Sequence, residues 1–386
     1  MLTYFWQTDQ WPNYYWRETE IFGPLTELRK IQGHLLGRTA DLGKAEETEL
    51  MAQFLEEDAV QTSAIEGENL NRDSIRSSIA LRLGLPAAVP AAFDPIADGL
   101  AEVLLDASQN YDLPLDENRL FAWHSALFPE GVSDLPKVPS GTWRTLPRQI
   151  VSGPIGRQQV HFDAPPPERV PSEMKLFFSW WEDSLKQSDG LIRAGLAHLY
   201  FVTIHPFSDG NGRLARALTD LALAQDEKTG LRLCSLSAQI MKERKEYCRA
   251  LELVQWTGGD CTDWLLWFFS CLKNAITGAE KKLDILFLKS RFWRTYGQIQ
   301  FSQRQRKILT RLADAGPQGF EGGLTTKKFA GMAKVSRATA YREIADLLEK
   351  GVLIPRPGGG RKAAYEINWK DLQQRRSEFS QAAGQN

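Results

Sequence analysis

The sequence contains no run of about 18 apolar residues, which is the length that a helix needs to cross a bilayer. It also has no basic and then apolar leader, because the first stretch, MLTYFWQTDQWPNYYW, is interrupted by polar side chains and by Pro12. These absences argue against a membrane partner and against export. We therefore expect a cytoplasmic protein.

Metal-binding patterns are lacking as well. None of the four cysteines has the paired CxxC spacing that is typical of zinc sites. Since they lie in stretches with helical periodicity, we expect reduced thiols in the core. These cysteines are Cys234, Cys248, Cys261 and Cys271. No spaced partner indicates a metal site at three histidines, which we expect to be structural: His34, His124 and His198.

The net charge of −1 conceals an asymmetry along the chain. Residues 289–386 contain 19 Lys and Arg against 8 Asp and Glu, whereas residues 1–288 contain 28 against 40. A length of 386 residues suits two or three domains. The charge pattern therefore predicts two regions with different electrostatic partners, the second of them basic.

Hydrophobic periodicity predicts a mainly α-helical chain. Helical patterns cover residues 46–65, 70–85, 97–111, 117–128, 171–188, 191–204, 213–225, 241–255 and 261–276. The least helical region is RQIVSGPIGRQQVHF, residues 148–162, which indicates two short strands around a Ser-Gly-Pro turn. We expect a helical body that carries one β-hairpin.

The stretch HPFSDGNGRLAR, residues 205–216, gathers groups suited to phosphate chemistry. His205 precedes a proline and is expected at a helix end, facing a loop over residues 208–212. The glycines and the following helix N-terminus form an anion cradle, in which Gly210, Asn211 and Gly212 lie.

Charged side chains complete the pattern. Arg213 and Arg216 share a helix face and can bind neighbouring phosphates, and Asp209 offers a hard oxygen ligand for Mg²⁺. His205 can accept a proton from an attacking hydroxyl. Each part alone also fits an ordinary helix end, turn or surface charge, but together they favour phosphoryl or nucleotidyl transfer.

This stretch resembles the signature of the Fic family, His-x-Phe-x-(Asp/Glu)-Gly-Asn-Gly-Arg-x-x-Arg, at every defined position. Fic proteins typically transfer AMP from ATP to a Ser, Thr or Tyr hydroxyl of a target protein. The resemblance implies that His205 is the general base, Asp209 the Mg²⁺ ligand, and residues 210–212 the phosphate cradle. It also implies that Arg213 and Arg216 bind the remaining phosphates.

A second stretch, TSAIEGEN at residues 62–69, is similar to the inhibitory motif of Fic proteins, (Ser/Thr)-x-x-x-Glu-(Gly/Asn). In that motif the glutamate pairs with the second arginine of the signature. The resemblance therefore implies a Glu66–Arg216 pair, with Thr62 as the first residue of the motif, that blocks productive ATP binding. A carboxylate near a helix C-terminus is unfavourable for the helix dipole, so Glu66 needs a cation elsewhere.

The predicted hairpin resembles the Fic flap. Val160, His161 and Phe162 fall on its second strand, whose edge can pair with an extended target segment.

Near the adenine the family often places two adjacent tyrosines and a downstream amide. Tyr247 matches the first tyrosine and Gln255 the amide, whereas Cys248 replaces the second tyrosine. The aromatic leader with Trp6, Trp11 and Trp16 resembles that of one Fic subgroup, and we expect a packing role for it.

The basic C-terminal region resembles a winged helix-turn-helix. Residues 325–333 and 336–350 read as two helices with a tight connection, and IPRPGGGRKAAYEI as a glycine-tipped hairpin. If this region binds DNA, the second helix reads bases and the wing contacts phosphates. The readers would be Ser336, Arg337, Thr339, Tyr341 and Arg342, and the wing residues Arg361 and Lys362.

The fold expected is a mainly α Fic-type body with a β-hairpin flap and a C-terminal winged helix. The predicted divisions are an N-terminal helical region over 1–110, a catalytic domain over 111–280, a connecting helix over 281–300 and a winged helix over 301–386.

The resemblance implies a protein adenylyltransferase that uses ATP and Mg²⁺ and is autoinhibited by Glu66. Two alternatives stay open. One is removal of AMP by Glu66 and His205, and the other is an ATP-sensing regulator that binds DNA. The target and the oligomeric state, a homodimer among the options, are not fixed by the sequence.

Overall fold

The computed structural model describes residues 3–40, 42–86, 93–129, 138–152, 159–357 and 363–369. The chain divides into two compact units, residues 1–279 and 280–386. The wing residues Arg361 and Lys362 lie outside the described residues. None of the helices in the described ranges combines the length and the apolar character needed to span a bilayer.

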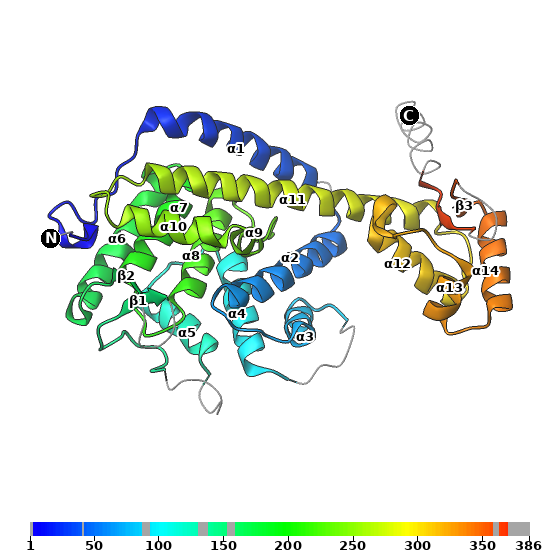
Figure 1. Ribbon diagram of the computed structural model, residues 1–386, viewed down its shortest axis with the longest axis horizontal. Helices are drawn as coiled ribbons and strands as arrows, with labels where there is room; N and C mark the ends of the chain where they lie inside the picture. The colour runs from blue at the N-terminus through cyan, green and yellow to red at the C-terminus, as the bar shows by residue number, and fades with distance from the viewer. Residues whose placement is uncertain are drawn as a thin grey trace. The chain divides into compact units, whose positions relative to one another are not determined.

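The first unit is mainly α-helical, as the sequence predicts (Figure 1). Its elements are η1 (Phe5–Gln7), α1 (Glu18–Thr39), α2 (Lys44–Ile65), α3 (Arg72–Arg82), α4 (Pro95–Gln109), α5 (Glu117–Leu127), β1 (Gln149–Ser152), β2 (Gln159–Asp163), η2 (Pro167–Arg169), α6 (Val170–Gln187), α7 (Gly190–Ile204), α8 (Asn211–Glu227), α9 (Leu236–Lys242) and α10 (Arg244–Val254). The boundary between the units falls within α11 (Thr262–Thr295).

Polar residues at the starts of these helices explain where they begin. Asn71 caps α3 by accepting hydrogen bonds from two backbone N–H groups, and Asp94 does the same for α4, which opens with Pro95. Asp189 caps α7, its Oδ1 lying 2.9 Å from the N of Leu191. The helix boundaries in this part of the chain thus follow from local sequence.

The core of the first unit is built around α7 and α8. Both helices are buried on nearly all sides, in keeping with the apolar sequence LIRAGLAHLYFVTI of α7. Helix α8 contacts α2, α4 and α7 (Figure 1). The loop between α7 and α8 is therefore held between rigid, fully packed elements.

Helix α2 is fixed to the body by a buried carboxylate. Asp58 accepts hydrogen bonds from the hydroxyls of Ser235 (2.7 Å) and Ser237 (3.1 Å) and from the backbone N–H of Ser237 (3.1 Å), at the start of α9. Asp58 is fully buried, so every one of these bonds is made away from water. This anchor lies one turn before Thr62 and sets the position of the C-terminal end of α2.

The second unit consists of α12 (Gln303–Gly319), α13 (Thr326–Ala333), α14 (Arg337–Glu349), β3 (Leu353–Pro355) and β4 (Tyr365–Ile367). Strands β3 and β4 form an antiparallel hairpin, and Leu324 bridges to Tyr365 beside it. The two helices predicted over residues 325–333 and 336–350 and the hairpin after them are present, and α12 precedes them. The assignment of this unit to the winged-helix class stays a prediction.

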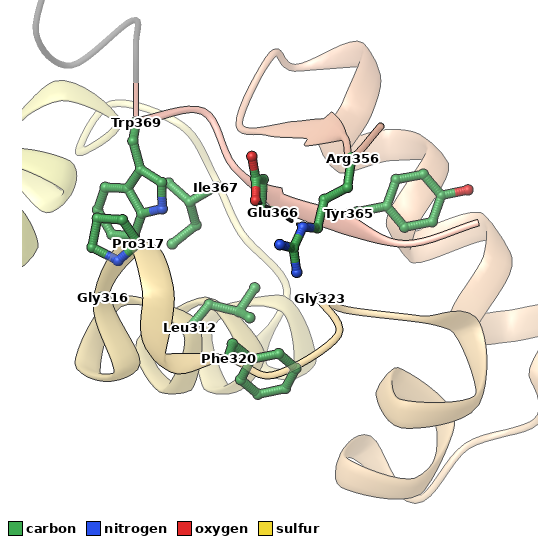
Figure 2. A pocket seen from close by; sticks show the side chains of 10 residues that line it. All are labelled: Leu312, Gly316, Pro317, Phe320, Gly323, Arg356, Tyr365, Glu366, Ile367 and Trp369. Atoms are coloured by element: carbon green, nitrogen blue, oxygen red, sulfur yellow. Dashed lines mark ion pairs between the residues drawn. The ribbon is translucent and has the colours of Figure 1, made fainter. Parts of the chain in front are cut away.

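A small pocket lies between α12 and the hairpin of the second unit (Figure 2). Phe320 and Trp369 contribute to its lining, and an ion pair of 3.1 Å joins Arg356 Nε to Glu366 Oε2 at one side. Gly316 also lines it with a positive φ of 68°, where α12 is interrupted. This kink takes the end of α12 off its helical path, and both Gly316 and Pro317 line the pocket.

Two expectations about single residues are wrong. The loop after His205 ends at Gly210, because α8 begins at Asn211 and not after Gly212. Of the four free cysteines, Cys248 is exposed rather than buried. Helix α10 buries only Tyr247 and Val254, so position 248 falls on its outer face. His34 lies on the exposed face of α1, whereas His124 and His198 are buried.

Candidate active site

His205 terminates α7 in a left-handed conformation, with φ 52° and ψ 58°. Its backbone N–H still donates to the carbonyl of Phe201 at 2.9 Å, while Pro206 prevents a further helical turn. A positive φ is uncommon for a residue with a β-carbon and marks a constrained position. The helix end therefore turns the imidazole out of the α7 ladder and toward the loop.

The imidazole of His205 is held as a neutral base. Its Nδ1 lies 3.3 Å from the carbonyl oxygen of Val202, which can only accept, so Nδ1 carries the proton and Nε2 the lone pair. Burial, together with the nearby positive charges of Arg148 and Arg144, lowers the pKa of His205 to about 4. At neutral pH the Nε2 atom can accept a proton.

The side chain of Asn211 closes the loop. Its Oδ1 accepts from the N–H of Phe207 (2.9 Å) and its Nδ2 donates to the carbonyl of the same residue (2.8 Å). Phe207 is fully buried and stacks on His124 at 4.1 Å between ring centroids. The side chain of Asn211 thus holds the loop in shape, and only its backbone N–H is left to bind an anion.

The N-terminus of α8 faces the space beside His205. Gly210 is the N-cap residue with φ 77°, and within the described residues no side chain caps this helix. The first backbone N–H groups of a helix carry partial positive charge and bind anions when nothing else satisfies them. A glycine at position 210 is required because a β-carbon there would also lie 2.8 Å from the ring of Phe128.

Glu66 lies directly over this helix start. A β-carbon added to Gly212 would lie 2.1 Å from Glu66 Oε1, so the carboxylate approaches the first turn of α8 as closely as glycine permits. The same oxygen accepts a hydrogen bond from Arg216 Nη2 at 2.8 Å. The Glu66–Arg216 pair predicted from the sequence is therefore present.

Arg216 is almost fully buried, with 1 % of its side chain exposed. Besides Glu66 it contacts Thr62, donating from Nε to the hydroxyl (2.6 Å) and from Nη2 to the backbone carbonyl (3.0 Å). Its Nη1 is buried and has no hydrogen-bond partner among the described residues. The Nε and Nη2 atoms of this guanidinium are thus bonded to residues 62–66, whereas Nη1 can still donate a hydrogen bond.

Arg213 has an acidic partner that the sequence reasoning missed. Its Nη1 lies 2.7 Å from Oε2 of Glu68, and its guanidinium lies 5.0 Å from the centre of the Phe128 ring. Like Arg216 it is buried, and its Nε has no hydrogen-bond partner among the described residues. The signal was present as a second glutamate in EGE, two residues beyond Glu66.

The two carboxylates differ in their electrostatic balance. Burial acts to raise the pKa of Glu66, but Arg216 and Arg213 together outweigh it, so this pKa is lowered. For Glu68, burial outweighs the attraction of Arg213, and the negative charges of Asp209 and Glu66 add to it, so its pKa is raised. Glu66 is therefore the more strongly stabilised anion of the two.

The residues predicted to contact adenine lie in a buried hydrogen-bond network. The hydroxyl of Tyr247 lies 2.9 Å from Nε2 of His198, whose Nδ1 lies 3.0 Å from the hydroxyl of Thr219. Gln255 donates from Nε2 to Thr203 Oγ1 at 3.0 Å. Since burial lowers the pKa of His198 to about 3, this network adds no positive charge behind Arg216.

The hairpin of β1 and β2 carries the predicted flap residues. Its register shifts between Ile150 and Val151, so His161 is an extra residue in β2, and its Nδ1 lies 3.3 Å from Glu252 Oε1 on α10. Val160 is 44 % exposed, whereas Phe162 is buried. The strand thus presents Val160 outward and is anchored by Phe162.

The N-terminal aromatic segment holds the flap from the outside. Trp6 donates from its indole N–H to the backbone carbonyl of Asp163 at 2.7 Å. The ring of Tyr4 packs edge-on against Phe162 at 5.2 Å, and it packs at a tilt against Trp256 at 4.3 Å. Because a two-stranded hairpin is marginally stable by itself, these contacts supply an anchor that β1 and β2 lack.

Arg144 is a further residue that the sequence analysis did not single out. Buried next to the loop, it donates from Nε to the carbonyl of His205 at 2.8 Å and also bonds the carbonyls of Leu146 and Pro165. Its backbone N–H donates to Pro206 at 2.9 Å. It thereby ties the end of α7 to the segments that flank the flap, without touching the reacting groups itself.

Asp209 lies in the loop with Oδ1 2.6 Å from the backbone N of Gly210. Within the described ranges no group of three or more His, Cys, Asp and Glu side chains could enclose a metal ion. A lone carboxylate nevertheless fits Mg²⁺, which keeps several waters and is commonly bound through one or two carboxylates and substrate phosphates. The donor chemistry of Asp209 is therefore compatible with the predicted ion.

In the second unit, α14 exposes the predicted readers. Ser336 caps the helix, its Oγ lying 3.1 Å from the N of Thr339. Arg337 and Arg342 are exposed, and Tyr341 is 63 % exposed. One helix face of the second unit is thus basic and aromatic.

Two family models match the chain. Residues 114–223 match the Fic/DOC family, a range that includes the whole of 205–216. Residues 4–85 match a domain of unknown function, DUF4172. The second match contains both the aromatic segment that contacts β2 and the acidic end of α2.

Similar curated proteins are named nucleotidyl transferases. The chain is 33 % identical over 118 residues to uridine 5'-monophosphate transferase of Xanthomonas campestris pv. campestris (strain 8004), covering 28 % of this chain and 21 % of that protein. It is 38 % identical over 78 residues to protein adenylyltransferase fic-1 of Caenorhabditis elegans, covering 19 % and 15 %. The aligned part of this chain thus spans about a fifth or less of the length of these relatives.

Solved structures show the same fold. A Fic family protein from Desulfovibrio desulfuricans G20 aligns over 92 % of this chain and 97 % of its own, with a TM-score of 0.54 and 20 % identity. A Fic-1 fragment from C. elegans aligns over 68 % and 73 %, with a TM-score of 0.50 and 20 % identity. At this identity the likeness concerns the mainly helical fold alone.

Proposed function

We propose that this chain, which is a Fic domain family protein, transfers AMP from ATP to a Ser, Thr or Tyr hydroxyl of a target protein. The observation that carries the proposal is the position of a neutral His205 beside a helix start without a side-chain cap and two buried arginines. The names of the relatives support nucleotidyl transfer as the reaction class. Catalysis of this kind depends on positioning and on charge stabilisation.

In the proposed reaction the target hydroxyl attacks the α-phosphorus of ATP. A new oxygen–phosphorus bond forms, the bond to the β-phosphate breaks, and pyrophosphate leaves. The hydroxyl proton passes to His205 Nε2, which carries the free lone pair. Arg144 holds the backbone of His205 and so acts as a positioning residue.

The N–H groups of Gly210, Asn211 and Gly212 and the two arginines would bind the phosphates. Asp209 would hold Mg²⁺, which when bound neutralises phosphate charge. The flap residues Val160, His161 and Phe162 would align the target segment along β2 by strand addition. A base site formed near Tyr247 and Gln255 is part of the same proposal.

Autoinhibition by Glu66 completes the proposal. Its carboxylate lies on Arg216 and over Gly212, in the space that an anion bound to the α8 N-terminus would need. ATP would then bind in a poorly aligned position, which a reaction that depends on in-line geometry tolerates badly. Thr62 supports this arrangement by fixing the Nε side of Arg216.

Transfer of α-phosphate label onto lysate proteins and onto the chain itself tests the proposal. Wild type, Glu66→Gly and Glu66→Gly with His205→Ala would be compared, each with Mg²⁺ and labelled ATP. Labelling that is strong only in Glu66→Gly supports the proposal, and no label in any variant overturns it. A parallel arm with labelled UTP is needed because one relative is named a uridine monophosphate transferase.

Removal of AMP from a modified protein is the competing reaction on the same residues. It predicts that AMP is released from a labelled target by the wild type and not by Glu66→Gly. DNA binding by the second unit is a separate proposal, which the exposed Arg337, Tyr341 and Arg342 on α14 favour.

A further inference from the structure

The short segment of residues 66–68 places two carboxylates on two different arginines of α8. Glu66 Oε1 is 2.8 Å from Arg216 Nη2, and Glu68 Oε2 is 2.7 Å from Arg213 Nη1. Both arginines are at least 98 % buried, whereas each glutamate side chain is about one-third exposed, at 35 % and 32 %. The cations are thus fixed in the protein, and the anions reach them from the solvent side.

The backbone between the two glutamates is closed in a defined turn. Gly67 has φ 86°, and the N–H of Glu68 donates to the carbonyl of Ser63 at 3.0 Å, a bond that spans the end of α2. Residue 67 has to be glycine because a side chain is strained in this conformation. The turn therefore carries Glu66 and Glu68 to their arginines together, as one unit attached to α2.

Each arginine also keeps an unused donor. Arg213 Nε and Arg216 Nη1 are buried and have no hydrogen-bond partner among the described residues. Buried guanidinium N–H groups are costly to leave unpaired. An additional anionic ligand between the two side chains would satisfy these donors.

We propose that residues 66–68 mimic two adjacent phosphate groups, with Glu68 holding Arg213 as Glu66 holds Arg216, so that the site selects ligands by the number of their adjacent phosphates. This inference rests on the proposed function only in assuming that the phosphates of the nucleotide bind at Arg213 and Arg216. It adds Glu68 as a second residue that competes with the ligand. It also gives residues 66–68, which lie within the DUF4172 match, a function of their own.

A ligand with one phosphate can be held while one of the two glutamates stays in place. A ligand with two or three adjacent phosphates has to displace both, because like charges at one guanidinium repel. Neutralising Glu68 should therefore strengthen the binding of ATP and ADP and leave AMP nearly unchanged. Since charge-assisted hydrogen bonds are strong but these carboxylates are partly exposed, we expect an effect of about tenfold.

The test is calorimetric titration of the full chain with AMP, ADP and ATP in the presence of Mg²⁺. Glu66→Gln, Glu68→Gln and the double variant are compared with wild type. Glu47→Gln is the matched control, since it makes the same change of charge at the opposite end of α2, the helix that residues 66–68 follow. Glutamine keeps the size of the side chain, and thermal melts check that each variant is folded.

We expect Glu68→Gln to bind ATP about tenfold more tightly than wild type, and the double variant to bind it more tightly still. The affinity for AMP should stay within twofold of wild type in every variant. Three results overturn the inference: no change for ATP in Glu68→Gln, an equal change for AMP and ATP, or no ATP binding by the double variant. Binding is measured without transfer. A failure of the proposed reaction therefore shows separately, as absence of label in variants that bind ATP as expected.

Discussion

The Oε1 atom of Glu66 lies 2.1 Å from the position that a β-carbon of Gly212 would occupy. A glutamate at the end of α2 and a glycine in the first turn of α8 are therefore in contact across 146 residues of sequence. The carboxylate can lie against the first turn of α8 only because position 212 has no side chain. The same space is open to phosphate when Glu66 moves away.

Gly212→Ala should therefore weaken transfer rather than activate it. The added methyl group would push the flexible Glu66 side chain aside, but it would also fill the phosphate position. In the Glu66→Gly background we expect the alanine to reduce label transfer by at least tenfold, with a loss of ATP affinity measured by titration. Equal labelling with glycine or alanine at position 212 would show that phosphate does not approach this turn.

The pH dependence of transfer should reflect the low pKa of His205. A base works only when unprotonated, so activity is lost as the pH falls through its pKa in the folded protein. That pKa is about 4, and removing Glu66, whose charge raises it, can only lower it further. Initial rates of Glu66→Gly at saturating ATP should thus stay level from pH 8 down to pH 5. A rate that falls to half its maximum near pH 6.5, the ordinary histidine pKa, would contradict the lowered pKa of this partly buried imidazole.

Local sequence predicted most of the helices, and it predicted the loop after α7 except for the position of its end. Caps such as Asp189, and the proline after His205, act within a few residues, so the end of α7 could be located without a structure. The Glu66–Arg216 pair was accessible only through resemblance to a family motif. Glu68 could not be assigned because its partner, Arg213, is 145 residues away and depends on the packing of α2 against α8. Arg144 could not be identified either, because its partners are backbone carbonyls, which every residue has and which therefore carry no sequence signal.

Arg144→Ala should destabilise the protein and disorder the end of α7. Three segments would lose a buried donor to their carbonyl groups, which we expect to cost about 2–4 kcal/mol of unfolding free energy. Arg144→Lys keeps the charge but not the planar array of donors, so it should recover only part of the stability. Urea unfolding measures both variants, and an alanine variant as stable as wild type would rule out this structural role.

Trp6→Phe should loosen the flap while leaving nucleotide binding intact. The substitution keeps an aromatic ring but removes the N–H that donates to Asp163. We expect faster hydrogen exchange of the amides in β2, and ATP affinity within twofold of wild type. Trp180→Phe serves as a control, because it is the same substitution at a ring that packs against Phe177 and Tyr200. Unchanged exchange in β2 would mean that Arg144 and His161 anchor the flap by themselves.

Arg337→Ala with Arg342→Ala should weaken any DNA binding by the second unit. Both side chains are exposed on α14, and neither one belongs to the buried core of that unit. Loss of two phosphate or base contacts is expected to reduce affinity about tenfold or more and to lower the slope of log K against log salt by up to about 2. Titration of the full chain with random-sequence duplexes at several salt concentrations gives both quantities.

Arg311→Ala provides a control. Arg311 is an exposed residue of α12, so this substitution removes one positive charge outside α14. If neither the wild type nor the control binds duplex DNA at low salt, the exposed face of α14 has to be assigned to a protein partner, because the tyrosine and arginines that it presents suit protein interfaces equally well.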